Sequence, residues 1–171
     1  IFTILSSCAA RQLEEVTFRR NTIPVQELFD AAGKYFRKVM KNRTEKVELI
    51  IEPMEAKVIG DVNQLRFLFE NLIDEALAVR EEGVIRLQAR KDNEYIRFLF
   101  TDTRREKSVT ELNQLFYPNL ARMTSGEKGE LRGTEYLICK QIIRDHDEFA
   151  GRRGCRINAE PAEGGGFTVY F

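Results

Sequence analysis

The chain has 171 residues, 43% of them hydrophobic, and its 27 Lys and Arg balance its 27 Asp and Glu, so that the formal net charge is zero. This composition is typical of one soluble domain of ordinary size. Zero net charge argues against a general nucleic-acid-binding protein, because non-specific affinity comes from Lys and Arg side chains that neutralise phosphates, although a local basic patch is compatible with it. No window approaches the run of about 20 apolar residues that a membrane span needs.

The cysteines indicate the redox compartment, and the first residue indicates whether the chain is a fragment. Cys8, Cys139 and Cys155 are widely spaced, without a CxxC pair, and predict packed, reduced thiols rather than a zinc site or a disulfide framework. The chain begins at Ile1 rather than Met, and we expect it to be a piece of a longer protein. We therefore predict a cytoplasmic domain, and a membrane anchor elsewhere in the parent protein is compatible with it.

Hydrophobic periodicity predicts the secondary structure. Apolar residues three and four positions apart predict helices, and strict alternation predicts strands. The predicted elements are, in chain order, helices over residues 1–20 and 25–40, a strand over 47–51, a helix over 62–80, strands over 84–89 and 95–100, a short segment at 112–116, a helix over 134–145, and strands over 155–159 and 167–171. Asp61 is the predicted N-cap of the third helix, because its carboxylate can accept hydrogen bonds from the free amides of the first turn.

The order of these elements predicts the fold class. Strands and helices alternate, but two pairs of strands follow each other directly and are expected to form hairpins. This order predicts an α+β fold, a two-layer α/β sandwich with an N-terminal helix, rather than a doubly wound parallel sheet. Residues 101–132 are largely polar and irregular, and long loops in compact domains are usually functional or disordered.

Seven sequence landmarks follow one another between Val47 and Phe171. They are Gly60 and Asp61 before a helix, the run Asn71 to Ala76 on that helix, Gly83 to Ile85, a strand ending in Asp102, Leu115 to Pro118, Gly133 and Thr134 followed by Ile138 to Ile143 and His146, and the closing Gly166 to Phe171. In this order they resemble the ATP-binding catalytic domain of sensor histidine kinases, with the Bergerat-type (GHKL) ATPase fold that DNA gyrase shares. The resemblance implies a role in two-component signal transduction, with ATP and Mg as ligands. It also implies two parts, residues 1–20 as the end of a dimerisation-type helix and residues 21–171 as the ATPase-like domain.

The resemblance assigns nucleotide-binding roles to positions that carry other residue types in this chain. Glu75 stands where the family has the Asn that helps to hold magnesium. The box that reads Asp-x-Gly-x-Gly in the family keeps Asp102, which there accepts from the adenine amino group, but has Arg104 and Glu106 at the two glycine positions. Glu135 replaces the second glycine of the Gly-x-Gly box at the start of a helix.

These substitutions change the expected chemistry. Glycine lets a backbone approach a ligand closely, so we expect Arg104 and Glu106 to reshape or fill the base pocket. Glu135 is a favourable helix cap, but it occupies the place where a phosphate would bind. Glu75 is an acceptable magnesium ligand, because Mg²⁺ binds carboxylates, and it also adds a negative charge beside a triphosphate.

The candidate site therefore has partial nucleotide-binding character and no assigned catalytic residue. The candidate nucleotide-binding residues are Asn71, Glu75, Asp102, Gly133 and Thr134, with Glu75 as the candidate Mg ligand and with Lys128 and Arg132 as basic lid residues that could reach phosphates. Asp102 is also a common type of turn cap, and the lid residues are equally typical of a solvated loop. His146 is the only His and is predicted to have a structural role near the end of a helix.

Two functions are compatible with this pattern. In the first, the chain is a degenerate ATPase domain with weakened or lost ATP binding that acts through a protein partner, or as a homodimer through the N-terminal helix. In the second, it is a divergent but active ATP-binding domain of a sensor histidine kinase that phosphorylates an upstream His. A third and weaker possibility is a pocket for another small molecule. Residues 1–20 contain no His, so this fragment is not expected to phosphorylate itself.

Overall fold

The computed structural model describes residues 18–118 and 133–171. Its helices are α2 (Val25–Met40), α3 (Val62–Leu77), α4 (Val109–Gln114) and α6 (Thr134–Phe149), and its strands are β1 (Asn21–Pro24), β2 (Val47–Ile51), β3 (Lys57–Gly60), β4 (Gly83–Asp92), β5 (Tyr95–Asp102), β6 (Asn158–Pro161) and β7 (Phe167–Tyr170). Most of the helix predicted over residues 1–20 lies outside the described residues, and residues 18–20 have no regular structure.

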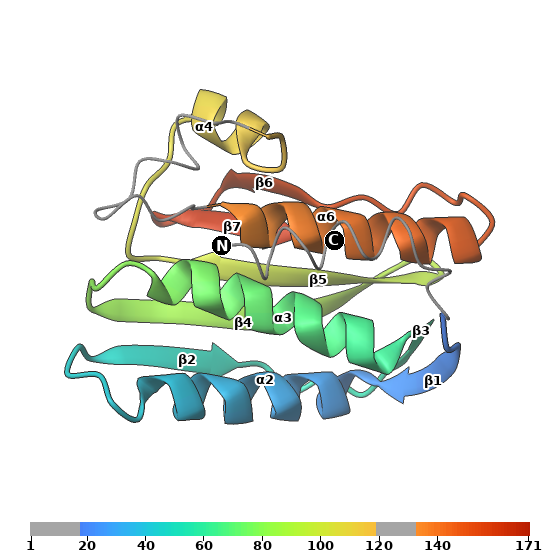
Figure 1. Cartoon of the computed structure of the whole chain (residues 1–171), viewed down its shortest axis with the longest axis horizontal. Coiled ribbons are helices and arrows are strands. Elements are labelled where there is room, and N and C mark those ends of the chain that lie inside the picture. The colour runs from blue at the N-terminus through green and yellow to red at the C-terminus, as the bar shows by residue number, and fades with distance from the viewer. Residues whose placement is uncertain (1–17, 119–132) are drawn as a thin grey trace.

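The architecture is the predicted α+β two-layer sandwich. Five strands form one sheet in the order β2-β4-β5-β7-β6, in which β2 pairs with β4 in parallel and the other neighbours are antiparallel. Helices α2, α3 and α6 lie side by side across one face of this sheet (Figure 1). Both predicted hairpins, β4-β5 and β6-β7, are present. Strands β1 and β3 form a separate antiparallel pair that the sequence did not predict.

The hydrophobic core lies between the helices and the sheet. Helix α2 buries one apolar face, formed by Val25, Leu28, Phe29, Ala32 and Phe36. Four aromatic rings, Phe29, Phe69, Phe98 and Phe171, pack with centroids 5.3 to 6.2 Å apart. Burial of rings this large is a major stabilising term. The packing places α3 firmly over β5, and so positions the ends of these two elements relative to each other.

Two boundaries near the C-terminus differ from the prediction. Helix α6 continues one turn beyond the predicted end at residue 145, so that His146 lies within the helix. Asp147 on this extra turn accepts hydrogen bonds from the backbone N–H groups of Gly154 and Cys155, both at 2.8 Å. Because the Asp147 side chain binds these donors, pairing with β7 begins three residues later than predicted.

Within residues 18–118 and 133–171, no helix is long and apolar enough to cross a membrane. In the same ranges no group of three or more His, Cys, Asp or Glu side chains is placed to hold a metal ion. Cys139 is buried, Cys155 is half-buried, and both are free thiols, as predicted, whereas Cys8 lies outside the described residues.

Candidate functional site

The predicted nucleotide-binding residues come from three elements that meet at one end of the sandwich. Asn71 and Glu75 lie on α3, which packs against α6. Asp102 is the last residue of β5, and Gly133 and Thr134 begin α6. The C-terminal ends of α3 and β5 and the N-terminal end of α6 all lie toward the left of Figure 1.

Arg104 binds Asp102 at this end of the molecule. The ion pair is bidentate, with 2.9 Å between Nε and Oδ1 and 2.9 Å between Nη2 and Oδ2. The other N–H groups of the guanidinium donate to carbonyl oxygens at and just beyond the end of α3, those of Ala76 at 2.6 Å, Val79 at 3.4 Å and Glu81 at 2.9 Å. A guanidinium has five N–H donors, so every donor of Arg104 has an acceptor within the protein.

This ion pair is buried. The Arg104 side chain is 0% exposed and that of Asp102 is 4% exposed. The backbone N–H of Arg104 also donates to Oδ1 of Asp102 at 3.0 Å, so both carboxylate oxygens have donors. The stem of Arg104 lies against the backbone of Gly83, where an added Cβ would be 2.7 Å from Cγ of Arg104. Glycine at position 83 thus leaves the space that the buried arginine needs.

Glu106 is exposed rather than buried. Its carboxylate points toward the turn between β6 and β7, where a Cβ added to Gly165 would lie 3.8 Å from Oε1 of Glu106. The sequence predicts that Arg104 and Glu106 reshape or fill the base pocket; in the structure the Arg104 side chain turns inward and Glu106 turns outward. Residues two apart point to the same side of a regular strand, but the chain after Asp102 is a loop, so these two side chains are free to diverge.

Glu75 and Glu135 form a carboxyl pair between α3 and the first turn of α6. Burial raises the pKa of Glu75 to about 7, helped by a hydrogen bond with Glu135 and by its charge, while the Gly133 backbone and the charge of Lys107 act in the opposite direction. The Thr134 hydroxyl donates to Oε2 of Glu135 at 3.4 Å. Glu75 therefore holds a proton at pH values where an ordinary glutamate has released it.

The remaining candidates divide into packed residues and residues outside the description. Asn71 is buried, and its Nδ2 donates to the Phe67 carbonyl one turn earlier at 2.7 Å, which is a packing role on α3. Gly133 is the N-cap residue of α6 with φ of 81°, in the left-handed region that favours glycine. The lid candidates Lys128 and Arg132 lie outside the described residues.

Comparison with known families identifies this arrangement. The family described as histidine kinase-, DNA gyrase B- and HSP90-like ATPase matches residues 60–171. The chain belongs to this family. It is 25% identical over 136 residues to the signal transduction histidine-protein kinase BaeS of Escherichia coli (strain K12), a match that covers 77% of this chain and 28% of that kinase. The chain thus spans well under half the length of this relative.

Solved histidine kinase structures share the fold. ThkA in complex with the response regulator protein TrrA matches with a TM-score of 0.73 at 18% identity, over 99% of this chain and 45% of that chain. Acinetobacter baumannii AdeS matches with a TM-score of 0.67 at 13% identity, over 99% of this chain and 75% of that chain. The cytoplasmic segment of QseC matches with a TM-score of 0.60 at 17% identity, over 98% of this chain and 89% of that chain. The predicted histidine kinase ATPase fold is confirmed.

His146 has a structural role in this ATPase domain, as the sequence predicts. Its Nε2 accepts from the backbone N–H of Asp61 at 3.0 Å, and its Nδ1 lies 2.8 Å from the Ile142 carbonyl, so the hydrogen-bond pattern assigns the proton to Nδ1. Burial lowers the pKa of His146. An added Cβ on Gly60 would lie 2.9 Å from Nε2, so a glycine lets the two elements meet. Phe18 packs edge-on against the imidazole, with 4.8 Å between centroids.

Glu75→Gln is expected to stabilise the domain at alkaline pH. The folded carboxyl has a pKa of about 7 against 4.5 for an ordinary glutamate, so the folded state binds more protons between these values. The stabilisation by the protonated form is therefore full below the lower value and is lost as pH rises through the upper one. A neutral glutamine avoids this loss, and its free energy of unfolding should exceed that of the wild type by on the order of 1–3 kcal/mol at pH 8.

Urea unfolding of the wild type and Glu75→Gln at pH 4 and pH 8 measures this difference. Glu163→Gln, at an exposed position in the turn after β6, is the matched control and should follow the wild type at both pH values. If the free energy of unfolding changed equally with pH in the wild type and in Glu75→Gln, the claim that Glu75 holds a proton beside Glu135 would be wrong.

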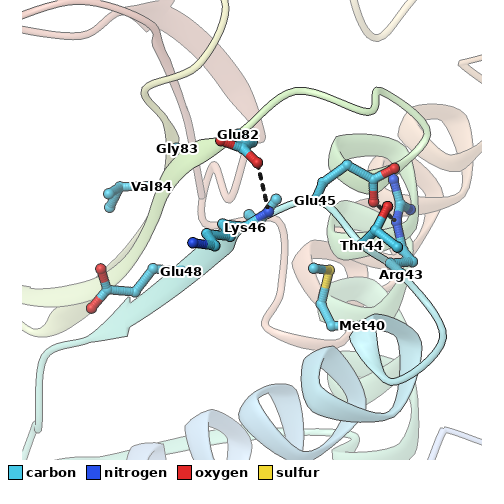
Figure 2. A pocket seen from close by; sticks show the side chains of 10 residues that line it. Met40, Arg43, Thr44, Glu45, Lys46, Glu48, Glu82, Gly83 and Val84 are labelled. Carbon is cyan, nitrogen blue, oxygen red and sulfur yellow. Dashed lines mark hydrogen bonds and ion pairs between the residues drawn. The ribbon is translucent and has the colours of Figure 1, made fainter.

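A separate groove of about 780 Å³ opens between the end of α2 and the starts of β2 and β4 (Figure 2). It is lined by Met40, Arg43, Thr44, Glu45, Lys46, Val47, Glu48, Glu82, Gly83 and Val84. Arg43 donates from Nε to Glu45 at 3.1 Å and from Nη1 to the Leu77 carbonyl, which caps the end of α3. Charges of both signs are interspersed along the groove, and its side chains do not converge on one point, so we assign it no ligand.

Proposed function

We propose that this chain is a degenerate histidine kinase ATPase domain, a signalling module with weakened or lost ATP binding that acts through contacts with proteins. One observation carries the proposal. The fully buried side chain of Arg104 binds both oxygens of Asp102, and the family resemblance assigns this carboxylate to the adenine amino group.

A nucleotide that used the same carboxylate would have to displace the guanidinium. Breaking a buried ion pair by removing one partner typically costs about 3–5 kcal/mol. Since about 1.4 kcal/mol corresponds to a tenfold change in Kd, displacement alone would weaken binding by roughly two to three and a half powers of ten. The carbonyl oxygens of Ala76, Val79 and Glu81 would lose their donor as well.

The phosphate end of the site supports the same proposal. The N-terminus of α6 would present backbone N–H groups to phosphates, but Glu75 and Glu135 are paired there. Two like charges about 4 Å apart repel by ~1 kcal/mol in water and by ~4 kcal/mol at an effective dielectric constant near 20. Glu75 would have to release the proton that it holds beside Glu135 before it could bind magnesium. The residues present therefore do not fit ATP and magnesium, and we derive no phosphoryl-transfer step for this chain.

The proposed activity lies in protein contacts on the cytoplasmic side of a signalling system. ThkA, one of the structural relatives, is seen in complex with a response regulator protein. We propose a partner of that class, or a second copy of the chain joined through the N-terminal segment 1–20, most of which lies outside the described residues. Residues 21–171 would then be the domain that presents the binding surface.

Hydrolysis of ATP tests the proposal. This chain is not expected to release phosphate from Mg-ATP above the background of a buffer blank. The matched control is the Asp102→Asn variant. Circular dichroism establishes that this variant is folded at the assay temperature. Turnover by the wild type that disappears in a folded Asp102→Asn variant would overturn the proposal in favour of a divergent, active kinase domain.

A further inference from the structure

The first two described residues are bound to the ends of two helices. Phe18 stacks on Phe149 at the end of α6, with 3.9 Å between ring centroids, and packs edge-on against His146 at 4.8 Å. The backbone N–H of Arg19 donates to Oδ2 of Asp61, the N-cap residue of α3, at 2.9 Å. The pair of β1 and β3 lies on the same side of the molecule as the C-terminal end of α6 (Figure 1, right). We call Phe18 and Arg19 the strap.

A neutral His146 connects the two points to which the strap is bound. Its Nε2 accepts from the backbone N–H of Asp61 at 3.0 Å, and its Nδ1 donates to the Ile142 carbonyl at 2.8 Å. From β3 the ring meets the uncharged Gly60, where an added Cβ would lie 2.9 Å from Nε2. An imidazolium donates from both ring nitrogens and accepts from neither. Protonation therefore removes the acceptor of the Asp61 N–H, and no rotation of the ring restores it.

The charged groups around His146 do not hold a proton on the ring. Asp61 on α3 and Asp145 on α6 favour the charged imidazole, but burial outweighs them and lowers the pKa of His146 from its ordinary value of 6.5. From the N-terminal side the ring meets the apolar Phe18, and the side chain of Arg19 is exposed. An imidazolium that donated to Oδ2 of Asp61 would compete with the backbone N–H of Arg19 for that oxygen. Protonation thus weakens the strap by this route as well.

We infer that the strap is a pH-sensitive attachment, which is closed while His146 is neutral and opens when His146 is protonated. The closed strap binds the proton more weakly than the open one. Its stability is therefore full above about pH 6.5 and is lost as the pH falls through the lower folded value. Opening would loosen the connection between the two helices and the chain that precedes residue 18. The inference does not depend on whether nucleotide binds.

NMR spectroscopy of the full chain between pH 7.5 and pH 5 tests the inference. His146 is the only His in the chain, so the imidazole signals report its titration directly. Hydrogen exchange of the Arg19 and Asp61 amides reports the strap. Their protection factors, corrected for the intrinsic effect of pH on exchange, should fall by about fivefold as the imidazole titrates, which is the factor that loss of one typical hydrogen bond produces. The amide of Phe98, which donates to a carbonyl in the sheet at 2.8 Å, is the internal control and should keep its protection.

Variants separate the proton on His146 from other causes. His146→Gln places a neutral acceptor near the position of Nε2 and should make the protection of both amides independent of pH. Phe18→Ala uncovers the ring and should raise the pKa of His146 toward 6.5, whereas Val109→Ala, at an exposed position on α4, should leave this pKa unchanged. Glu75 has a pKa of about 7 but lies at the other end of α3, so the strap of Glu75→Gln should respond to pH as that of the wild type does.

Three results would overturn the inference. They are unchanged protection of the Arg19 and Asp61 amides while the imidazole titrates, the same pH dependence in a folded His146→Gln variant, and a pKa of His146 that Phe18→Ala leaves unchanged. If His146→Gln does not fold, the titrations of the wild type and of Phe18→Ala still decide. These measurements use no nucleotide, so their failure is separable from failure of the proposed ATP-binding defect.

Discussion

Arg104→Met is expected to lower the free energy of unfolding by about 3–5 kcal/mol, because it leaves the buried carboxylate of Asp102 without its counter-ion. Methionine fills much of the volume of the arginine stem, so the loss comes mainly from the missing guanidinium. The three carbonyl acceptors at the end of α3 also lose their donor. Urea unfolding followed by circular dichroism measures the change.

The neighbouring arginine provides the matched control. Arg105 is exposed, and Arg105→Met should stay within about 0.5 kcal/mol of the wild type. The double variant Asp102→Asn with Arg104→Met should be less unstable than the sum of the two single changes, because residues in one buried pair are coupled. An Arg104→Met chain as stable as Arg105→Met would contradict the structural role of the pair.

Restoring the family residues is expected to create nucleotide binding. The variant combines Glu75→Asn, Arg104→Gly, Glu106→Gly and Glu135→Gly, which removes the guanidinium that binds Asp102 and both carboxyls at the phosphate end. Its Kd for Mg-ATP should be at least about 100-fold lower than that of the wild type, which is the contribution expected from freeing a buried carboxylate alone. Isothermal titration calorimetry with the full chain measures both values.

Loss of Arg104 also destabilises the domain, so a folded control accompanies this variant. The chain with Glu75→Asn and Glu135→Gly keeps the buried ion pair and should fold, but it should gain little affinity because Asp102 remains occupied. Equal affinity of the two-residue and four-residue variants would show that Arg104 does not obstruct the site. Unchanged, undetectable binding by a folded four-residue variant would place the obstruction elsewhere.

Much of the fold follows from patterns within single segments. The apolar face of α2 and the strand at residues 47–51 have the predicted bounds. Asp61 caps α3 as predicted, with its carboxylate accepting from the N–H groups of Asn63 at 3.0 Å and Gln64 at 3.1 Å. These features depend on neighbours within one or two turns, which the sequence displays directly.

Features that depend on distant contacts could not be predicted in the same way. The pairing of β1 with β3 joins segments more than 30 residues apart, and the start of β6 depends on how Asp147 folds back onto the turn after α6. By its sequence pattern, Asp102 is a kept nucleotide contact and Arg104 an altered one. Their pairing became visible only in three dimensions, although an arginine two residues after a buried strand-end aspartate is the sequence signal that could have suggested it.

Thermal unfolding of the unmodified chain, with and without excess Mg-ATP and separately with metal-free ADP, tests the central claim most directly. A ligand at about 100 times its Kd stabilises the folded state by ~2.7 kcal/mol, which is a rise of roughly 5–10 °C in Tm for a domain of this size. The buried pair of Arg104 and Asp102 predicts no shift at millimolar nucleotide. A rise of that size, absent in a folded Asp102→Asn chain, would contradict the account and identify a working ATP site.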